Sequence, residues 1–216
     1  MKTTFLMIPL FALGAAGVTP KNSINATVKV SSFTLPVSNF QHDPLMESMD
    51  KMMKEMHGQP MKGNTDLDFA AMLKLHHQGA INMSKIELQQ GKDAMMKKMA
   101  QEIITKQTKE IGQLDMLISS LQSGPKNYDP ANKKSGAAKA MADNMMSMMK
   151  MGKMSMSSPD HEFADMMSKH HKDGILMSKS ILTYCKNSKL RSMAQMGITE
   201  QTKDIQQMQQ WMKSHQ

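Results

Sequence analysis

Two pairs of adjacent histidines, each flanked by methionines, are the side chains of this sequence best suited to chemistry. Met72, His76 and Met83 are four and seven residues apart, so on a helix they share one face. The same pattern returns as Met166, His170 and Met177. Soft thioether sulfur favours copper(I), and imidazole also accepts copper(II). The pattern therefore predicts copper ligation, although a packed core helix that contains a hydrogen-bonded histidine has the same spacing.

The second histidine of each pair, His77 or His171, lies about 100° around the helix from the first, so we expect it to face a neighbouring helix or solvent. Both histidines of each pair are candidate ligands, and the spacing does not say which one binds. Farther along the chain, Glu110 and Asp204 occupy positions from which a carboxylate could orient a facing histidine through its second ring nitrogen. An ordinary polar pair would fit these positions equally well.

Methionine is the dominant apolar residue, with 29 copies in 216 residues against nine aromatic side chains (six Phe, two Tyr, one Trp). Clusters precede both histidine pairs and supply a further set of expected copper ligands: Met49, Met53, Met56, Met145, Met146 and Met149. Some of them also form a heptad-like stripe, which is typical of flexible core filler. Other methionines fall outside that stripe: Met52, Met146, Met149, Met154 and Met156. This surplus favours a role for sulfur beyond packing.

The N-terminal segment predicts export. Residues 1–18 combine a short charged start, an apolar run too short to span a bilayer and small residues suited to cleavage, which is typical of a signal peptide. A retained membrane anchor is the alternative. Residues 19–41 are rich in Ser, Thr, Asn and Val and are expected to form a flexible tether. The mature protein is then periplasmic or secreted, without a membrane span, and its single Cys185 has no partner for a disulfide.

An offset of 94 residues aligns the chain with itself and defines two repeats, residues 42–122 and 137–216, joined by a linker at 123–136. In the first repeat we expect helices at 44 to about 56, 65 to 91 and 94 to about 121, the second opened by a capping box at Thr65-x-x-Asp68. The helices of the second repeat should begin near 137, 159 and 188. Two helical hairpins of this kind are expected to pair as a four-helix bundle, a single all-α domain over 42–216, with the two short Met-rich helices outside it.

The run from Asp68 through His76-His77-Gln78-Gly79 to Met83, followed by Gln107 and Glu110, resembles family 305 of the domains of unknown function. The resemblance spans roughly residues 68–117 and again 161–211. It implies a ferritin-like, exported helical protein that supports copper tolerance, since the family includes a cyanobacterial periplasmic copper-binding protein. The ligands it implies are Met72, His76, His77 and Met83 with their copies Met166, His170, His171 and Met177. The second copy departs from the pattern at Lys172-Asp173-Gly174, which leaves the shape of that turn open.

Composition and missing motifs argue against other functions. The net charge is +8, but a single arginine among 27 basic residues is unlike a nucleic-acid reader. A ferritin-like di-iron oxidase would use Glu-x-x-His motifs, which the sequence lacks, so no catalytic residue and no enzyme activity are expected. The expected partners are copper ions and a copper exporter or another periplasmic copper protein. The remaining alternative is a scaffold that binds a partner protein through adaptable methionines without any metal.

Overall fold

The computed structural model describes residues 43–150 and 157–215, and this part of the chain contains six helices and no strand. The bounds are α1 Pro44–Gly58, α2 Thr65–Gln90, α3 Ala94–Leu121, α4 Gly136–Met148, α5 Pro159–Tyr184 and α6 Ser188–Ser214. The predicted all-helical class is confirmed. The expected signal peptide at 1–18, the expected tether at 19–41, Met154 and Met156 lie outside the described residues. None of the described helices is long and apolar enough to cross a bilayer.

Helix starts follow side chains that accept hydrogen bonds from free backbone N–H groups. Asp93 caps α3, Ser158 caps α5 and Asn187 caps α6, and these helices begin at the positions that the sequence predicts. The predicted capping box at the start of α2 is wrong. Asn64 is the N-cap and accepts from Leu67 N, because the left-handed turn at Gly63 (φ 84°) brings the chain into the helix one residue earlier. The Asp68 carboxylate instead accepts from the backbone N–H groups of residues 62 and 63.

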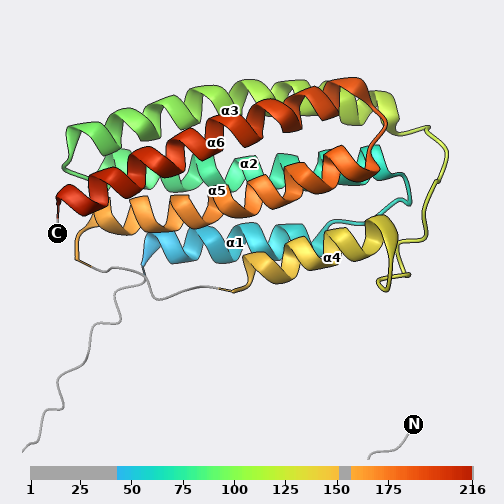
Figure 1. Cartoon of the computed structure of the whole chain (residues 1–216), viewed down its shortest axis with the longest axis horizontal. Coiled ribbons are helices and arrows are strands. Elements are labelled where there is room, and N and C mark those ends of the chain that lie inside the picture. The colour runs from blue at the N-terminus through green and yellow to red at the C-terminus, as the bar shows by residue number, and fades with distance from the viewer. Residues whose placement is uncertain (1–42, 151–156, 216) are drawn as a thin grey trace, which may run out of the picture. The chain divides into compact units, whose positions relative to one another are not determined.

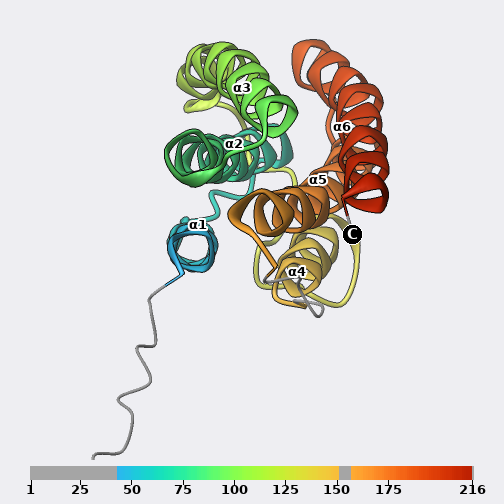
Figure 2. The same cartoon turned by 90° about the vertical axis from the view of Figure 1, so that its left-hand side faces the viewer.

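The helices form three layers (Figures 1 and 2). In the end view of Figure 2, α2 and α5 lie in the middle, α3 and α6 on one side, and α1 and α4 on the other. Each long helix of the middle layer packs most closely against the helix that follows it, α2 against α3 and α5 against α6. The middle pair also packs together, while α3 and α6 touch only sparsely. The short Met-rich helices cover the far sides of α2 and α5, outside the four long helices.

Two aspartates at equivalent repeat positions tie the halves together. The Asp66 carboxylate on α2 accepts from Lys186 N and Asn187 N in the turn before α6, at 2.8 and 3.0 Å. The Asp160 carboxylate on α5 accepts from the backbone N–H groups of residues 92 and 93 in the turn before α3, at 2.9 and 2.8 Å. The start of each middle helix therefore meets the end of the other. Hence α2 and α5 run antiparallel, and equivalent residues near their centres lie against each other.

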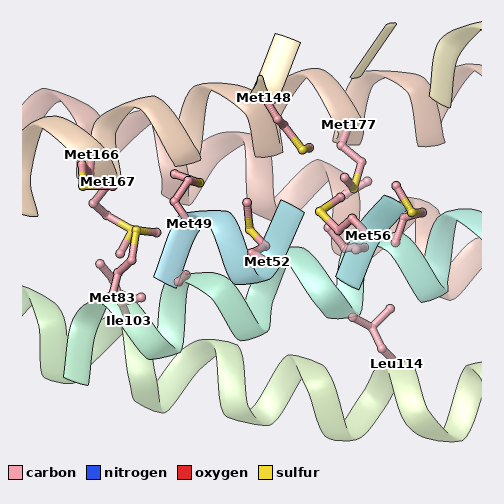
Figure 3. Packing of buried hydrophobic residues seen from close by; sticks show 14 of the residues in the cluster. Met49, Met52, Met56, Met83, Ile103, Leu114, Met148, Met166, Met167 and Met177 are labelled. Atoms are coloured by element: carbon pink, nitrogen blue, oxygen red, sulfur yellow. The ribbon is translucent and has the colours of Figure 1, made fainter. Parts of the chain in front are cut away.

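Methionine is the commonest residue of the buried apolar core. Met49, Met52 and Met56 of α1 are almost fully buried, and Figure 3 shows them between α1 and the middle layer. Met148 reaches into the same region from α4, opposite Met52 (Figure 3). An unbranched thioether adapts to irregular gaps, which suits a core that has few aromatic rings. The plain packing role of methionine is thus fulfilled by a large part of the cluster.

Candidate metal centre

The centre of the molecule is a stacked pair of imidazoles at the point where α2 and α5 cross. The rings of His76 and His170 lie 3.7 Å apart between centroids, with 27° between their planes. Both side chains are essentially inaccessible to solvent. His170 Nε2 donates to the backbone carbonyl of His76 at 3.0 Å, which leaves the lone pair on His170 Nδ1. The two repeats therefore place their equivalent histidines in direct contact.

The second histidine of each pair faces the outer helix of its own repeat. His77 Nε2 lies 2.8 Å from a carboxylate oxygen of Glu110 on α3, and His171 Nε2 lies 3.4 Å from one of Asp204 on α6. These are the two carboxylates that the sequence picked out as orienting groups. Neither contact has hydrogen-bond alignment, so a rotation of the ring is needed before the carboxylate can accept its N–H. The outer rings lie 6.5 and 6.0 Å from their neighbours in the central pair.

Most nitrogen atoms of this four-imidazole centre have no hydrogen-bond partner within the described part of the chain. This holds for both ring nitrogens of His76, His77 and His171 and for Nδ1 of His170. A buried polar atom without a partner costs about 1–3 kcal/mol. The centre consequently concentrates donor atoms that a bound ion would satisfy.

The central imidazoles are held in the neutral form. Burial lowers the pKa of His76 and of His170 well below 6.5, and the neighbouring histidines lower both pKa values further because two positive charges would repel. Neutral imidazole is the form that binds a metal ion. The central pair is therefore ready to ligate at neutral pH without first losing a proton.

The flanking methionines are buried but do not surround the imidazoles. Met72, Met83, Met166 and Met177 all have at most 2% of their surface exposed. Figure 3 shows Met83 beside Met167 at one side of the view, and Met177 beside Met56 at the other. Because α2 and α5 are antiparallel and cross at the central pair, histidine meets histidine there and the thioethers fall one or more turns away on either side. The eight predicted ligands are thus spread along the crossing instead of gathered round one point.

No three His, Cys, Asp or Glu side chains among the described residues converge on a single metal-binding position. In this arrangement the imidazoles are stacked and not fanned about a common centre. The donor set fits copper in chemistry, with neutral imidazoles and nearby thioethers, and the unpartnered nitrogens provide the observation for that fit. Ligation would require the rings to turn about their side-chain bonds.

A small cavity of about 20 Å³ lies between α3 and α6, near the outer histidines. Its lining includes Glu110, Asp204 and two glutamines, Gln107 and Gln201, whose carbonyl oxygens are buried and have no hydrogen-bond partner in the described structure. A space of this size holds about one water molecule. Two carboxylates of its lining, Glu110 and Asp204, are the ones that lie against the outer histidines.

Close packing at two glycines explains why the repeats differ in the segment whose shape the sequence left open. A Cβ at Gly174 would lie 2.4 Å from Gln201 Oε1 and 2.9 Å from His76 Cε1, so the glycine admits the glutamine to the centre. In the first repeat Gly79 instead makes room for Met52 of α1. Helix α5 continues without a break through residues 172–174, and the buried Asp173 carboxylate accepts from a serine hydroxyl of α4.

Replacing Gly174 by alanine is expected to destabilise the protein by about 1–2 kcal/mol, because the methyl group must displace both Gln201 and an imidazole in a packed interior. Chemical unfolding of the metal-free protein measures this. Gly112→Ala is the matched control, since no described atom lies within 4 Å of the added methyl group on an exposed helix surface. The control should gain about 0.5–1 kcal/mol from helix propensity. Equal effects of the two substitutions would contradict the proposed contact.

The further set of predicted ligands is divided by the structure. Met49 and Met56 are buried, Met53 and Met145 are half-buried, and the side chains of Met146 and Met149 are 56% and 61% exposed. Four of these six line one cavity, here called the methionine pocket, whose sulfur-bearing residues are Met56, Met61, Met72, Met141, Met145, Met146 and Met149. Its remaining lining includes His57, which sequence reasoning missed, while Met61 and Met141 belong to the methionine clusters of the sequence but were not among the expected ligands. Spacing could not reveal them because they come from separate elements.

Comparison with known proteins places the fold. Residues 66–212 match the family model described as "Domain of unknown function (DUF305)". The chain is similar to the crystal structure of a candidate secreted protein, DUF305, from Streptomyces coelicolor, with a TM-score of 0.51 and 19% identity over 68% of this chain and 91% of that one. A DUF305 fragment from Deinococcus radiodurans has a TM-score of 0.49 and 15% identity over 69% of this chain and 96% of that one. No curated protein matches the chain. None of these descriptions mentions copper, so the expected likeness to a copper-binding protein stays a prediction.

Proposed function

This chain belongs to the DUF305 family, and we propose that it is an exported protein that binds copper at the four-imidazole centre and sequesters or carries it. The observation that carries the proposal is the buried cluster of four imidazoles, in which burial keeps His76 and His170 neutral and all ring nitrogens except His170 Nε2 have no hydrogen-bond partner in the described structure. A core that needed only volume would be better filled by apolar side chains, because unpartnered polar atoms cost stability. The retained imidazoles therefore favour a ligand-binding role.

Each part of the centre has a task in this proposal. His76 and His170 supply the innermost nitrogens, and His77 and His171 supply the outer ones. Glu110 and Asp204 would accept the remaining ring N–H of the outer histidines and fix their tautomer, which strengthens a nitrogen ligand. Thioethers of Met72, Met83, Met166 and Met177 are within one to two turns of the imidazoles. When bound, copper(I) would be stabilised by soft sulfur and copper(II) by imidazole.

The finer identity is part of the same proposal. We infer a ferritin-like arrangement of two tandem helical hairpins, export to the periplasm or beyond, and a contribution to copper tolerance in partnership with a copper exporter or another periplasmic copper protein. The family resemblance and the helical contacts support these inferences. A metal-free scaffold is the competing function, favoured by exposed methionines such as Met116 and Met196. It gives the buried imidazoles no role.

The test is an anaerobic copper(I) titration of the full chain against a colorimetric chelator, with zinc and iron as controls for selectivity. A His76→Leu/His170→Leu variant should compete at least tenfold less well for copper(I), because both inner donors are lost while the space stays filled. His161→Gln/His215→Gln, outside the centre, is the matched control and should bind as the wild type does. Circular dichroism verifies that both variants remain helical. Unchanged competition by the His76→Leu/His170→Leu protein would overturn the proposal.

A further inference from the structure

The methionine pocket is a cavity of about 350 Å³ between the C-terminal end of α1, helix α4 and the linker that precedes α4. Sulfur reaches it from five separate segments: α1, the loop after α1, α2, α4 and the residue that follows α4. Chain segments this far apart in sequence converge on one space only in the folded protein. The pocket is therefore a feature of the tertiary structure and not a by-product of one Met-rich helix.

Exposure changes across the methionine pocket from rim to floor. Met146 and Met149 at the rim have 56% and 61% of their surface exposed, whereas Met56, Met72 and Met141 at the floor have 1%, 2% and 5%. Exposed methionine contributes little to packing, so the rim residues are not explained by the core. The exposed rim sulfur atoms can contact a ligand as it enters, and the buried floor sulfur atoms can hold it once it is bound.

His57 adds a nitrogen donor to the methionine pocket. Its Nδ1 donates to the backbone carbonyl of Met53 at 2.9 Å, a bond that fixes the tautomer and leaves the lone pair on Nε2. Histidines that bind metals usually donate their other ring N–H to a carbonyl or carboxylate in this way. The pocket thus combines several thioethers with one imidazole already oriented for ligation.

The charge of the lining selects among ligands. None of the described lining residues is an aspartate or a glutamate, and Lys133 is the charged side chain among them. Hard divalent cations require oxygen donors and would gain little here, whereas a soft monovalent cation is held by neutral sulfur. The nearby Asp68 carboxylate is already occupied, because it accepts from the Tyr128 hydroxyl at 2.6 Å and from two backbone N–H groups. Its bond to Tyr128 holds the linker in place as one wall of the pocket.

We propose that the methionine pocket binds one soft monovalent cation, copper(I) or its analogue silver(I), through rim and floor thioethers and His57 Nε2. This site is separate from the four-imidazole centre, and it rests on the proposed function only for the identity of the metal. Met72 lies one turn before His76 on α2, so the floor of the pocket adjoins the centre. An ion bound by Met72 at the floor would lie about one helical turn from His76.

The probe is silver(I), which does not change oxidation state during the titration. In isothermal calorimetry of the full chain, the variant Met145→Leu/Met146→Leu/Met149→Leu should differ from the wild type by one bound silver(I) ion. That ion should either be lost or bind at least tenfold more weakly. Leucine has a similar volume to methionine, so α4 should keep its packing. Met95→Leu/Met116→Leu/Met196→Leu removes three exposed sulfurs outside the pocket and should bind silver(I) as the wild type does.

Two further arms separate this site from the centre. In the His76→Leu/His170→Leu background the pocket equivalent should persist, and it should disappear when the three rim substitutions are added. In protein labelled with ¹³C at the methionine methyl groups, resonances lost in the rim variant should shift with an early equivalent of silver(I). Two results together would refute the pocket: the rim variant binds as much silver(I) as the wild type, and the rim methyl resonances of the wild type do not shift on silver(I) addition. The proposed function of the centre would be unaffected.

Discussion

Metal-free protein is expected to lose more stability between pH 7 and pH 5 than a His76→Leu/His170→Leu variant does, by up to about 4 kcal/mol. Burial lowers the folded-state pKa of both central histidines, and the charges of His77, His171 and, for His76, Lys169 lower it further. A lowered pKa means that the unfolded chain binds protons that the folded chain refuses. The contribution of these histidines to stability is therefore intact above the unfolded pKa of about 6.5 and falls as the pH drops below it, by at most about 2 kcal/mol for each histidine down to pH 5.

Urea unfolding at pH 7 and pH 5, followed by circular dichroism, measures the difference. Other groups titrate over this range, so the quantity to compare is the pH-dependent change in the variant against that in the wild type. His161→Gln/His215→Gln should follow the wild-type curve, because those histidines are outside the buried centre. Parallel pH dependence of all three proteins would show that the central pair is not held neutral by the fold.

The helices are predictable from sequence because their ends depend on local chemistry. Asp93, Ser158 and Asn187 cap helices at the positions that the sequence indicates, and the caps need no knowledge of distant residues. The error at Thr65 has a local origin too, since the positive φ of Gly63 sets where α2 begins and no residue pattern makes that angle plain. The presence of the helices is therefore predictable from the sequence, whereas the N-cap residue of α2 is not.

The candidate site is only half predictable for a geometric reason. Residue spacing tells which side chains share a helix face, and it correctly put His76 on a buried face and Glu110 within reach of a histidine. It does not tell which residue of one helix meets which residue of another. The antiparallel crossing pairs imidazole with imidazole and moves the flanking thioethers away, so a ligand set read along one helix, such as Met72, His76 and Met83, overstates how closely its members approach.

The methionine pocket lies beyond spacing for the same reason. Met61 is in a loop and Met141 is on a short helix with no sequence link to α1, so only the fold brings them together. The sequence did indicate that the chain has more methionines than one apolar helix stripe requires. Exposed Met146 and Met149 belong to that excess, and the structure gives them a location without stating their ligand.

Glu87→Gln is expected to stabilise the protein by on the order of 2–3 kcal/mol at pH 8 and by much less at pH 5. Glu87 is a buried carboxyl group on α2, whose equivalent in the second repeat is the apolar Ile181. Burial, the Asp160 carboxylate and Asp93 together raise its pKa to about 8, with Lys97 opposing them. A raised acid pKa means that the folded state holds a proton that the unfolded state releases. Stability therefore falls as the pH rises from about 4.5 to 8, and glutamine removes that loss.

The neighbouring Asp160 determines which of the two carboxyl groups carries the proton. Burial alone would raise the pKa of Asp160, but the bonds from the backbone N–H groups of residues 93 and 92 outweigh it and lower that pKa. Asp160 consequently stays charged as a cap for the α3 turn, and the proton resides on Glu87. Thermal unfolding between pH 5 and pH 8 should show that the melting temperature of Glu87→Gln increases relative to that of the wild type as the pH rises, whereas the exposed Glu102→Gln keeps a constant difference from the wild type. A Glu87→Gln protein that loses as much stability on alkalinisation as the wild type would place the proton elsewhere.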